Sequence, residues 1–198
     1  MLNFSDNQLI TGVEIDVRSF KGDLILHHDP FKDGVKLNDW ISRFDLSLLI
    51  VNVKEEGLED HLIKILKNSG IINYFILDET IPYIIKYCNS GFSKFALRVS
   101  LWEDLSSAVK IVETMDCKPS WIWLDTFNGE ISIDHADIKK LKSLNLKICL
   151  VSPELHPEYK HKVPNDTFVK QFENLGRENF DAVCTKQEAF WFKLNSIK

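Results

Sequence analysis

The stretch "GVEIDVRSFKGDLILHHDPF" (residues 12–31) decides how we interpret the chain. Its first half alternates apolar and charged residues, a period of two that is typical of a β-strand with one face on a hydrophobic layer. Glu14, Asp16 and Arg18 fall on one face of this strand, and the apolar residues between them fall on the other. A Lys-Gly-Asp turn then leads into a second apolar run, which ends in His28 and Asp29. The stretch therefore predicts one side of a polar site that rests on a hydrophobic layer.

Six further apolar runs follow, separated by amphipathic segments, at residues 46–53, 73–79, 94–100, 120–126, 147–152 and 180–185. Strands that alternate with helices indicate parallel βαβ units. One predicted helix ends at Gly70. A second opens at Ser100 with Glu103 three residues later, a capping-box pattern, and a third has Asp134 as its cap.

The polar residues at the carboxyl ends of these runs indicate the fold class. Asn52, Lys54, Asp78, Arg98 and Asp125 each lie at such an end. Charged groups that converge from several strand ends are typical of a barrel whose site opens at its C-terminal face. Seven units fit either a barrel that lacks one unit or an open doubly wound sheet. The strand ends favour an α/β, (β/α)8 TIM-barrel-like fold that lacks the first βα unit, with about seven parallel strands.

The composition bounds the class of protein. The chain has 198 residues, of which 44% are hydrophobic and 27% charged, so we expect a single globular domain over residues 1–198. The net charge of −5 and the scattered lysines and arginines argue against a nucleic-acid partner. No apolar run reaches the roughly eighteen residues of a membrane span, and the amino terminus lacks a signal-peptide pattern. The four cysteines have no metal-ligand spacing, so we expect reduced thiols and a cytoplasmic location.

The first segment resembles the signature of the glycerophosphodiester phosphodiesterase family and its phospholipase-C-like TIM-barrel relatives. That signature is a strand E-x-D, a turn with a small residue and an apolar strand ending in H-D, matched here by Glu14, Asp16, Gly22, His28 and Asp29. The chain also resembles a bacterial subgroup of this family that is often found with surface-polysaccharide genes. The resemblance lies at "NVKEEGL", "FILDET" and "VSPELH", which occur in the same order along the chain. The resemblance extends from residue 12 to about residue 190.

The resemblance implies a divalent metal, Mg²⁺ or Ca²⁺, held by Glu14 and Asp16. Asn52 stands where many family members carry a third carboxylate, and its amide oxygen is still a ligand for a hard cation. The same resemblance implies two catalytic residues. His28 would be one half of an acid/base pair, and Lys54 would neutralise charge on the phosphoryl oxygens.

Four further residues are candidates for contact with a small phosphodiester or sugar phosphate. Arg18, Arg98 and Asp125 lie at strand ends, and Glu154 lies in a long loop over the predicted mouth. His156, in the same loop, could also touch substrate. The alternative for these strand-end residues is a structural network of charges inside the barrel mouth.

The chain also departs from the family pattern. The family's first strand ends in His-Arg, but only eleven residues precede Gly12 here, and none is His or Arg. The resemblance is therefore to an N-terminally shortened or degenerate member. A barrel that lacks one strand exposes two sheet edges, so we expect self-association or a covering segment.

Three functions stay open on the sequence. The first is metal-dependent hydrolysis of a glycerophosphodiester or of a sugar or polyol phosphodiester, linked to surface-polysaccharide metabolism. The second is a non-catalytic barrel that binds a phosphorylated sugar or a protein partner, which the missing His-Arg favours. The third, an isomerase of sugar phosphates, depends on fold analogy alone.

Overall fold

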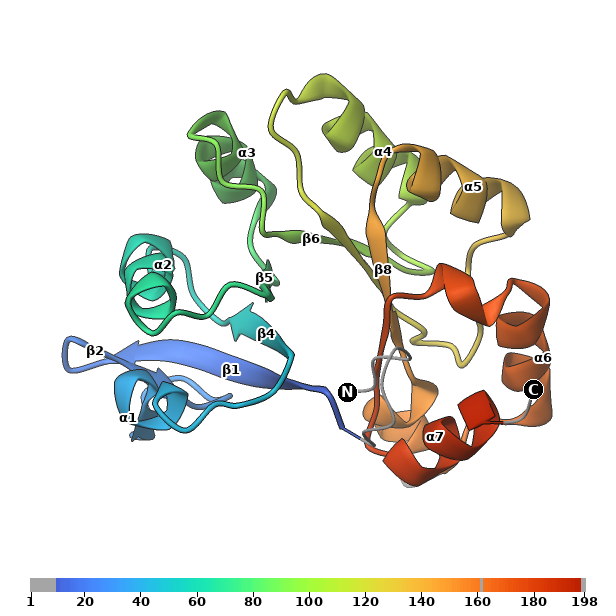
Figure 1. The fold of residues 1–198 in the computed structure, drawn as a ribbon, viewed down its shortest axis with the longest axis horizontal. Coiled ribbons are helices and arrows are strands. Elements are labelled where there is room, and N and C mark those ends of the chain that lie inside the picture. The colour runs from blue at the N-terminus through green and yellow to red at the C-terminus, as the bar shows by residue number, and fades with distance from the viewer. Residues whose placement is uncertain (1–9, 161, 197–198) are drawn as a thin grey trace.

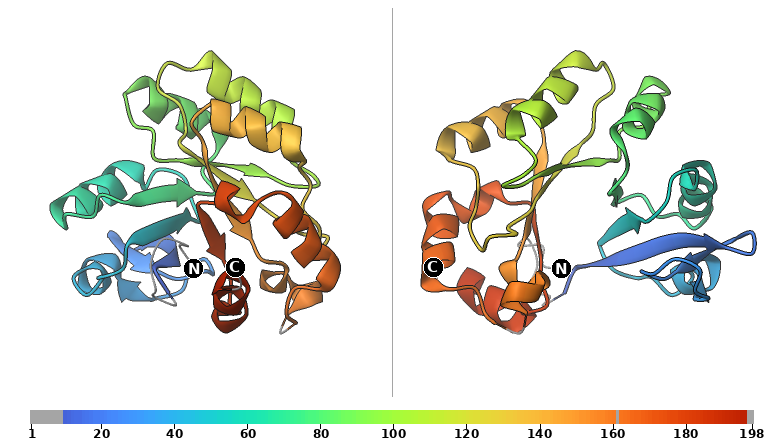
Figure 2. Two further views of the ribbon diagram at one scale, coloured as in Figure 1. Left: turned by 45° about the vertical axis from the view of Figure 1, so that its right-hand side comes forward. Right: turned by 180° about the vertical axis from the view of Figure 1, so that it is seen from behind.

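A computed structural model describes residues 10–160 and 162–196. Its strands form a curved sheet with the helices on the outer side (Figures 1 and 2). Seven strands run parallel: β1 (Gly12–Phe20), β4 (Leu48–Val53), β5 (Tyr74–Leu77), β6 (Ala96–Val99), β7 (Trp121–Leu124), β8 (Lys147–Val151) and β9 (Ala182–Cys184). Two short antiparallel strands, β2 (Asp23–Leu26) and β3 (Val35–Lys36), extend the sheet beyond β1. The helices are α1 (Leu37–Ile41), α2 (Glu59–Asn68), α3 (Ile81–Asn89), α4 (Leu105–Thr114), α5 (His135–Ser143), α6 (Asp166–Asn174) and α7 (Glu188–Ser196).

The strands fall into two ladders, in the orders β3-β2-β1-β4-β5 and β6-β7-β8-β9. The junction between β5 and β6 is thin, because it consists of a single parallel bridge between Ile76 and Phe95 and a 2.8 Å hydrogen bond from Ile76 N–H to the Lys94 carbonyl. Among the described residues, no ladder joins β9 to β1. The result is an open TIM-barrel-type α/β fold with seven parallel strands, which confirms the predicted fold class.

The alternation in β1 places its side chains as predicted. Ile15 and Val17 are buried in the apolar layer between strands and helices. The opposite, inner face of the sheet carries a second apolar cluster, in which Phe75 stacks on Trp121 with ring centroids 4.6 Å apart. This inner cluster fills the interior with apolar side chains, and the charged side chains of the cleft lie toward the carboxyl ends of the strands. No helix among the described residues is long and apolar enough to cross a membrane.

Two of the three helix signals in the sequence are confirmed. Helix α2 ends just before Gly70, which has φ of 70°, and Asp134 caps α5 in a reciprocal capping box with Asp137. The predicted start at Ser100 is wrong. Helix α4 begins at Leu105, because the Asp104 carboxylate accepts the Ser106 N–H at 3.0 Å.

Candidate functional site

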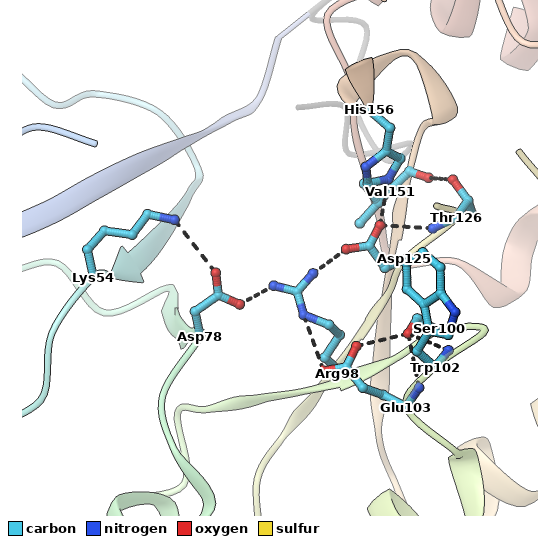
Figure 3. Close-up of polar contacts among 10 residues, drawn as sticks. All are labelled: Lys54, Asp78, Arg98, Ser100, Trp102, Glu103, Asp125, Thr126, Val151 and His156. Carbon is cyan, nitrogen blue, oxygen red and sulfur yellow. Dashed lines mark hydrogen bonds and ion pairs between the residues drawn. The ribbon is translucent and has the colours of Figure 1, made fainter. Parts of the chain in front are cut away.

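An alternating series of charges crosses the mouth from β4 to β7. Lys54 Nζ lies 3.0 Å from Asp16 Oδ1 and 3.7 Å from Asp78 Oδ2. Asp78 in turn pairs with Arg98, and the same guanidinium pairs with Asp125 (Figure 3). Lys54, Asp78, Arg98 and Asp125 each lie at or just after the carboxyl end of a strand, which is why strands from both ladders contribute to one network. Asp16 lies within β1, beside Asn52 of β4.

The series continues to a histidine on the loop after β8. His156 Nε2 lies 2.7 Å from Asp125 Oδ1, and the His156 ring packs on Phe127 with centroids 4.5 Å apart. Asp125 is only 2% exposed, and its Oδ1 also accepts the Thr126 N–H at 2.9 Å. The Asp125 carboxylate is therefore fixed by the backbone and shared between a guanidinium and an imidazole.

The predicted metal ligands lie side by side on the inner face. Asp16 is paired with Asn52 in the β1–β4 register, and Glu14 lies one inward-facing position earlier on β1. Burial and the neighbouring Asp16 raise the pKa of Glu14, while a hydrogen bond from Asn52 and the charge of Lys54 oppose that rise. Asn52 Oδ1 is buried and has no hydrogen-bond partner.

These three residues fit a hard divalent cation. The unpartnered Asn52 oxygen and two adjacent carboxylates make an all-oxygen donor set, which Mg²⁺ and Ca²⁺ prefer. Among the described residues, no three His, Cys, Asp or Glu side chains form a metal-binding group by themselves. A cation here would therefore need the amide oxygen of Asn52 in addition to Glu14 and Asp16.

The predicted catalytic histidine lies at the edge of the same cleft. His28 is exposed, and its Nδ1 lies 3.0 Å from Asp29 Oδ1. Arg18 donates from Nε to the His28 carbonyl and from Nη1 to the Lys54 carbonyl, both at 2.9 Å. Arg18 is not among the residues that line the cleft. It instead ties together the backbones of the two residues for which catalytic roles are predicted.

Glu154 is placed differently from the sequence prediction. It is 4% exposed, and its carboxylate accepts hydrogen bonds from the Ser152 and Thr185 hydroxyls and, at 3.0 Å, from the Lys186 N–H. Trp191 Nε1 donates to the same Ser152 hydroxyl at 2.9 Å. Glu154 thus connects the ends of β8 and β9 and does not line the cleft, since the turn of residues 153–155 directs it inward.

The cleft itself has a volume of about 710 Å³, within the usual range for small-molecule sites. Its polar lining includes Glu14, Asp16, His28, Asn52, Lys54, Arg98, Asp125 and His156. Asp78 and His156 also contribute to this region. On the sequence, Asp78 is a polar residue directly after an apolar strand, and His156 lies beside Glu154 in the loop over the predicted mouth. Of these two loop residues, His156 lines the cleft and Glu154 does not.

The fold and the cleft define a TIM-barrel-type α/β protein with a charged cleft at the carboxyl ends of its strands. No protein-family model and no curated protein matches the chain. The structure is similar to a crystal structure from Agrobacterium tumefaciens strain C58, of a protein assigned as a glycerophosphoryl diester phosphodiesterase. The TM-score is 0.65 at 10% sequence identity, and the match covers 93% of this chain and 85% of that chain. At this identity the similarity shows the fold.

Proposed function

We propose that the protein is a metal-dependent phosphodiester hydrolase that acts on a glycerophosphodiester or on a sugar or polyol phosphodiester. One observation carries the proposal: two carboxylates, an unpartnered amide oxygen, a lysine and a histidine line a single cleft at the ends of parallel strands. The assignment of the structurally similar Agrobacterium protein supports the same reaction class.

The residues of the cleft divide into two roles. Glu14, Asp16 and Asn52 would hold a divalent cation, which, when bound, supplies Lewis-acid polarisation of a phosphoryl group. Lys54 neutralises negative charge on the phosphoryl oxygens, and its ammonium already lies 3.0 Å from Asp16. His28, exposed at the edge, is placed to exchange a proton with a reacting oxygen.

The first test is calorimetric titration of the folded chain with Mg²⁺ and with Ca²⁺. We expect binding to the wild type and a loss of roughly tenfold or more in affinity for Glu14→Ala, since even residues that only support metal ligands cost that much. Glu130→Gln, an exposed carboxylate outside the cleft, is the matched control. Equal affinities for all three proteins, or no binding to a well-folded wild type, would remove the metal from the proposal.

A second titration separates the metal from the phosphate. Lys54→Ala should retain its affinity for Mg²⁺ and lose its affinity for glycerol phosphate, because Lys54 is an anion ligand in this scheme. Loss of metal binding in this variant would instead make Lys54 a structural partner of Asp16.

One observation favours a second candidate, a barrel that binds a phosphorylated sugar or a protein partner without hydrolysing a bond. Lys54 and Arg98 are both already neutralised by carboxylates, so an incoming phosphate must compete with Asp78 and Asp125 for them. This candidate predicts metal-independent binding of a sugar phosphate and no turnover of any phosphodiester.

A further inference from the structure

The cleft contains a second histidine whose surroundings differ from those of His28. His156 follows a short 3-10 turn, Pro153–Leu155, and its side chain is 14% exposed. It follows β8 and lines the same cleft as the β1 residues Glu14 and Asp16. His28 is 73% exposed, and its Nδ1 contacts its own neighbour, Asp29.

The two ring nitrogens of His156 have different environments. Nε2 is buried and lies 2.7 Å from Asp125 Oδ1, in a direction too bent to count as a hydrogen bond. Nδ1 has no hydrogen-bond partner among the described residues, and it is not a buried atom. The residue therefore contacts a buried carboxylate through Nε2, while Nδ1 has no hydrogen-bond partner among the described residues and the residue as a whole lines the cleft.

The backbone around this histidine is firmly placed. Its N–H donates to the Pro153 carbonyl at 2.9 Å, and its carbonyl accepts the Tyr159 N–H at 3.0 Å. The Tyr159 hydroxyl donates to the Asn128 carbonyl at 2.7 Å, which joins this loop to the loop after β7. The Phe127 ring packs on the imidazole.

The carboxylate that faces the histidine is fixed equally well. Asp125 Oδ1 accepts the Thr126 N–H, and Oδ2 pairs with Arg98, as Figure 3 shows. Thr126 Oγ1 in turn donates to the Val151 carbonyl at 2.7 Å, which connects the ends of β7 and β8. A base oriented by a fixed third group is the arrangement expected of a proton-transfer residue.

We propose that His156 is a second catalytic residue, which protonates the leaving oxygen of the phosphodiester through Nδ1, and that Asp125 is its positioning residue. This assignment rests on the hydrolase function proposed above. In the step, the oxygen of a water molecule bonds to phosphorus and the bond from phosphorus to the leaving oxygen breaks. The imidazolium of His156 gives its proton to that oxygen, which departs as an alcohol. The proton lost by the attacking water passes to the second base of the proposal, His28, which lines the same cleft.

The assignment predicts a dependence on the leaving group. A nitrophenolate departs without protonation, whereas a more basic oxygen needs an acid. Removal of a positioned acid should therefore matter little for the first and cost roughly 10²–10⁴-fold for a basic leaving group. A residue that merely shapes the cleft would affect both alike.

The experiment measures kcat/KM for methyl phenyl phosphates whose ring carries a para-nitro group, a para-chloro group or no substituent. The wild type, His156→Gln and the control His61→Gln are compared with Mg²⁺ present. His61 lies exposed on α2, outside the cleft. We expect the loss in His156→Gln to grow along the series and His61→Gln to match the wild type throughout. His156→Asn replaces His156→Gln if the latter does not melt cooperatively.

Each outcome decides something. An equal loss for all three substrates, or no loss, overturns the role of His156 while the hydrolase function stands. A folded wild type that cleaves none of the substrates overturns the proposed function and this assignment with it. Asp125→Asn should reproduce part of the same leaving-group trend, because it leaves the imidazolium without its carboxylate.

Discussion

A buried pair of carboxyl groups lies between the amino-terminal ends of α2 and α3. Glu59 is 1% exposed and Glu79 is 8% exposed. The Glu59 carboxylate accepts the Gly57 N–H at 2.9 Å, and Glu79 Oε1 accepts the Thr80 N–H at 3.0 Å. Glu79 Oε2 is buried and has no hydrogen-bond partner when both carboxyl groups are ionised. A proton on one of the two carboxyl groups would let it donate a hydrogen bond to the other. We therefore expect the pair to share one proton in the folded protein.

This arrangement makes stability depend on pH in a definite direction. Burial, followed by the hydrogen bond and the charge of Glu59, raises the pKa of Glu79 from its ordinary 4.5 to about 8. The unfolded chain releases this proton above pH 4.5, but the folded protein retains it until about pH 8. The contribution is thus fully present below pH 4.5, and raising the pH through this window favours the unfolded state.

The magnitude follows from the two pKa values. With one pKa unit worth about 1.4 kcal/mol, the wild type should lose about 2.5 kcal/mol of unfolding free energy from this group between about pH 5 and about pH 7. Glu79→Gln keeps a donor for Glu59 and cannot ionise. The variant should therefore gain about 2.5 kcal/mol relative to the wild type across that interval, as measured by urea unfolding at several pH values.

The control is Glu56→Gln, an exposed carboxylate on the preceding loop whose charge also acts on Glu79. It should leave most of the pH dependence in place. If the unfolding free energies of the wild type and Glu79→Gln ran parallel from about pH 5 to about pH 8, the shared proton would be refuted.

Three substitutions test the fold and the mouth by urea unfolding. Arg98→Ala leaves the buried Asp125 carboxylate without its guanidinium and should cost about 3 to 5 kcal/mol; a cost near zero would mean that the pairing adds nothing. Leu49→Ala empties a fully buried position in the layer between β4 and the helices and should cost about 2 to 5 kcal/mol, whereas a small cost would indicate a site that collapses freely. Gly34→Ala places a Cβ 2.4 Å from the Leu26 carbonyl oxygen and should cost about 1 to 3 kcal/mol, and an unchanged midpoint would show that the loop shifts aside.

The fold could be predicted from the sequence because each parallel strand is marked by its own run of apolar residues or by alternating apolar and polar residues. In β1 the alternation alone placed Ile15 and Val17 toward the helices and Glu14 and Asp16 toward the interior. The parallel register of β1 and β4 then places Asn52 beside Asp16. No local sequence pattern predicts this contact, but it follows once both strands are taken to run in the same direction. Site residues at strand ends were therefore predictable in their positions. Their catalytic, metal and substrate roles stay predictions, as does self-association.

What could not be predicted depends on which side chains meet across distant loops. The polar segment around Glu154 indicated an exposed loop, yet the hydroxyls of Ser152 and Thr185 are close enough to bury its carboxylate. The contact of Asp125 with His156 joins loops that follow different strands, and the sequence gives no sign of which residues face each other there. The helix start at Asp104 was missed because Ser100 and Glu103 form a hydrogen-bonded turn of their own before it.

The ion pairs of Lys54, Asp78, Arg98 and Asp125 at the mouth also have a structural role, because one of them joins the two ladders. The two ladders meet through a single bridge at Ile76, and the ion pair between Asp78 and Arg98 crosses the same junction at the mouth. A phosphate that draws Arg98 away from Asp78 would weaken this crossing unless it also contacted Lys54 on the other ladder. An anion that contacts both would replace the carboxylate and hold the ladders together. If a phosphate binds here as proposed, its binding and the integrity of the β5–β6 junction should be linked through Asp78, Arg98 and Lys54, and an anion that contacts only Arg98 should stabilise the fold less than one that contacts both cations.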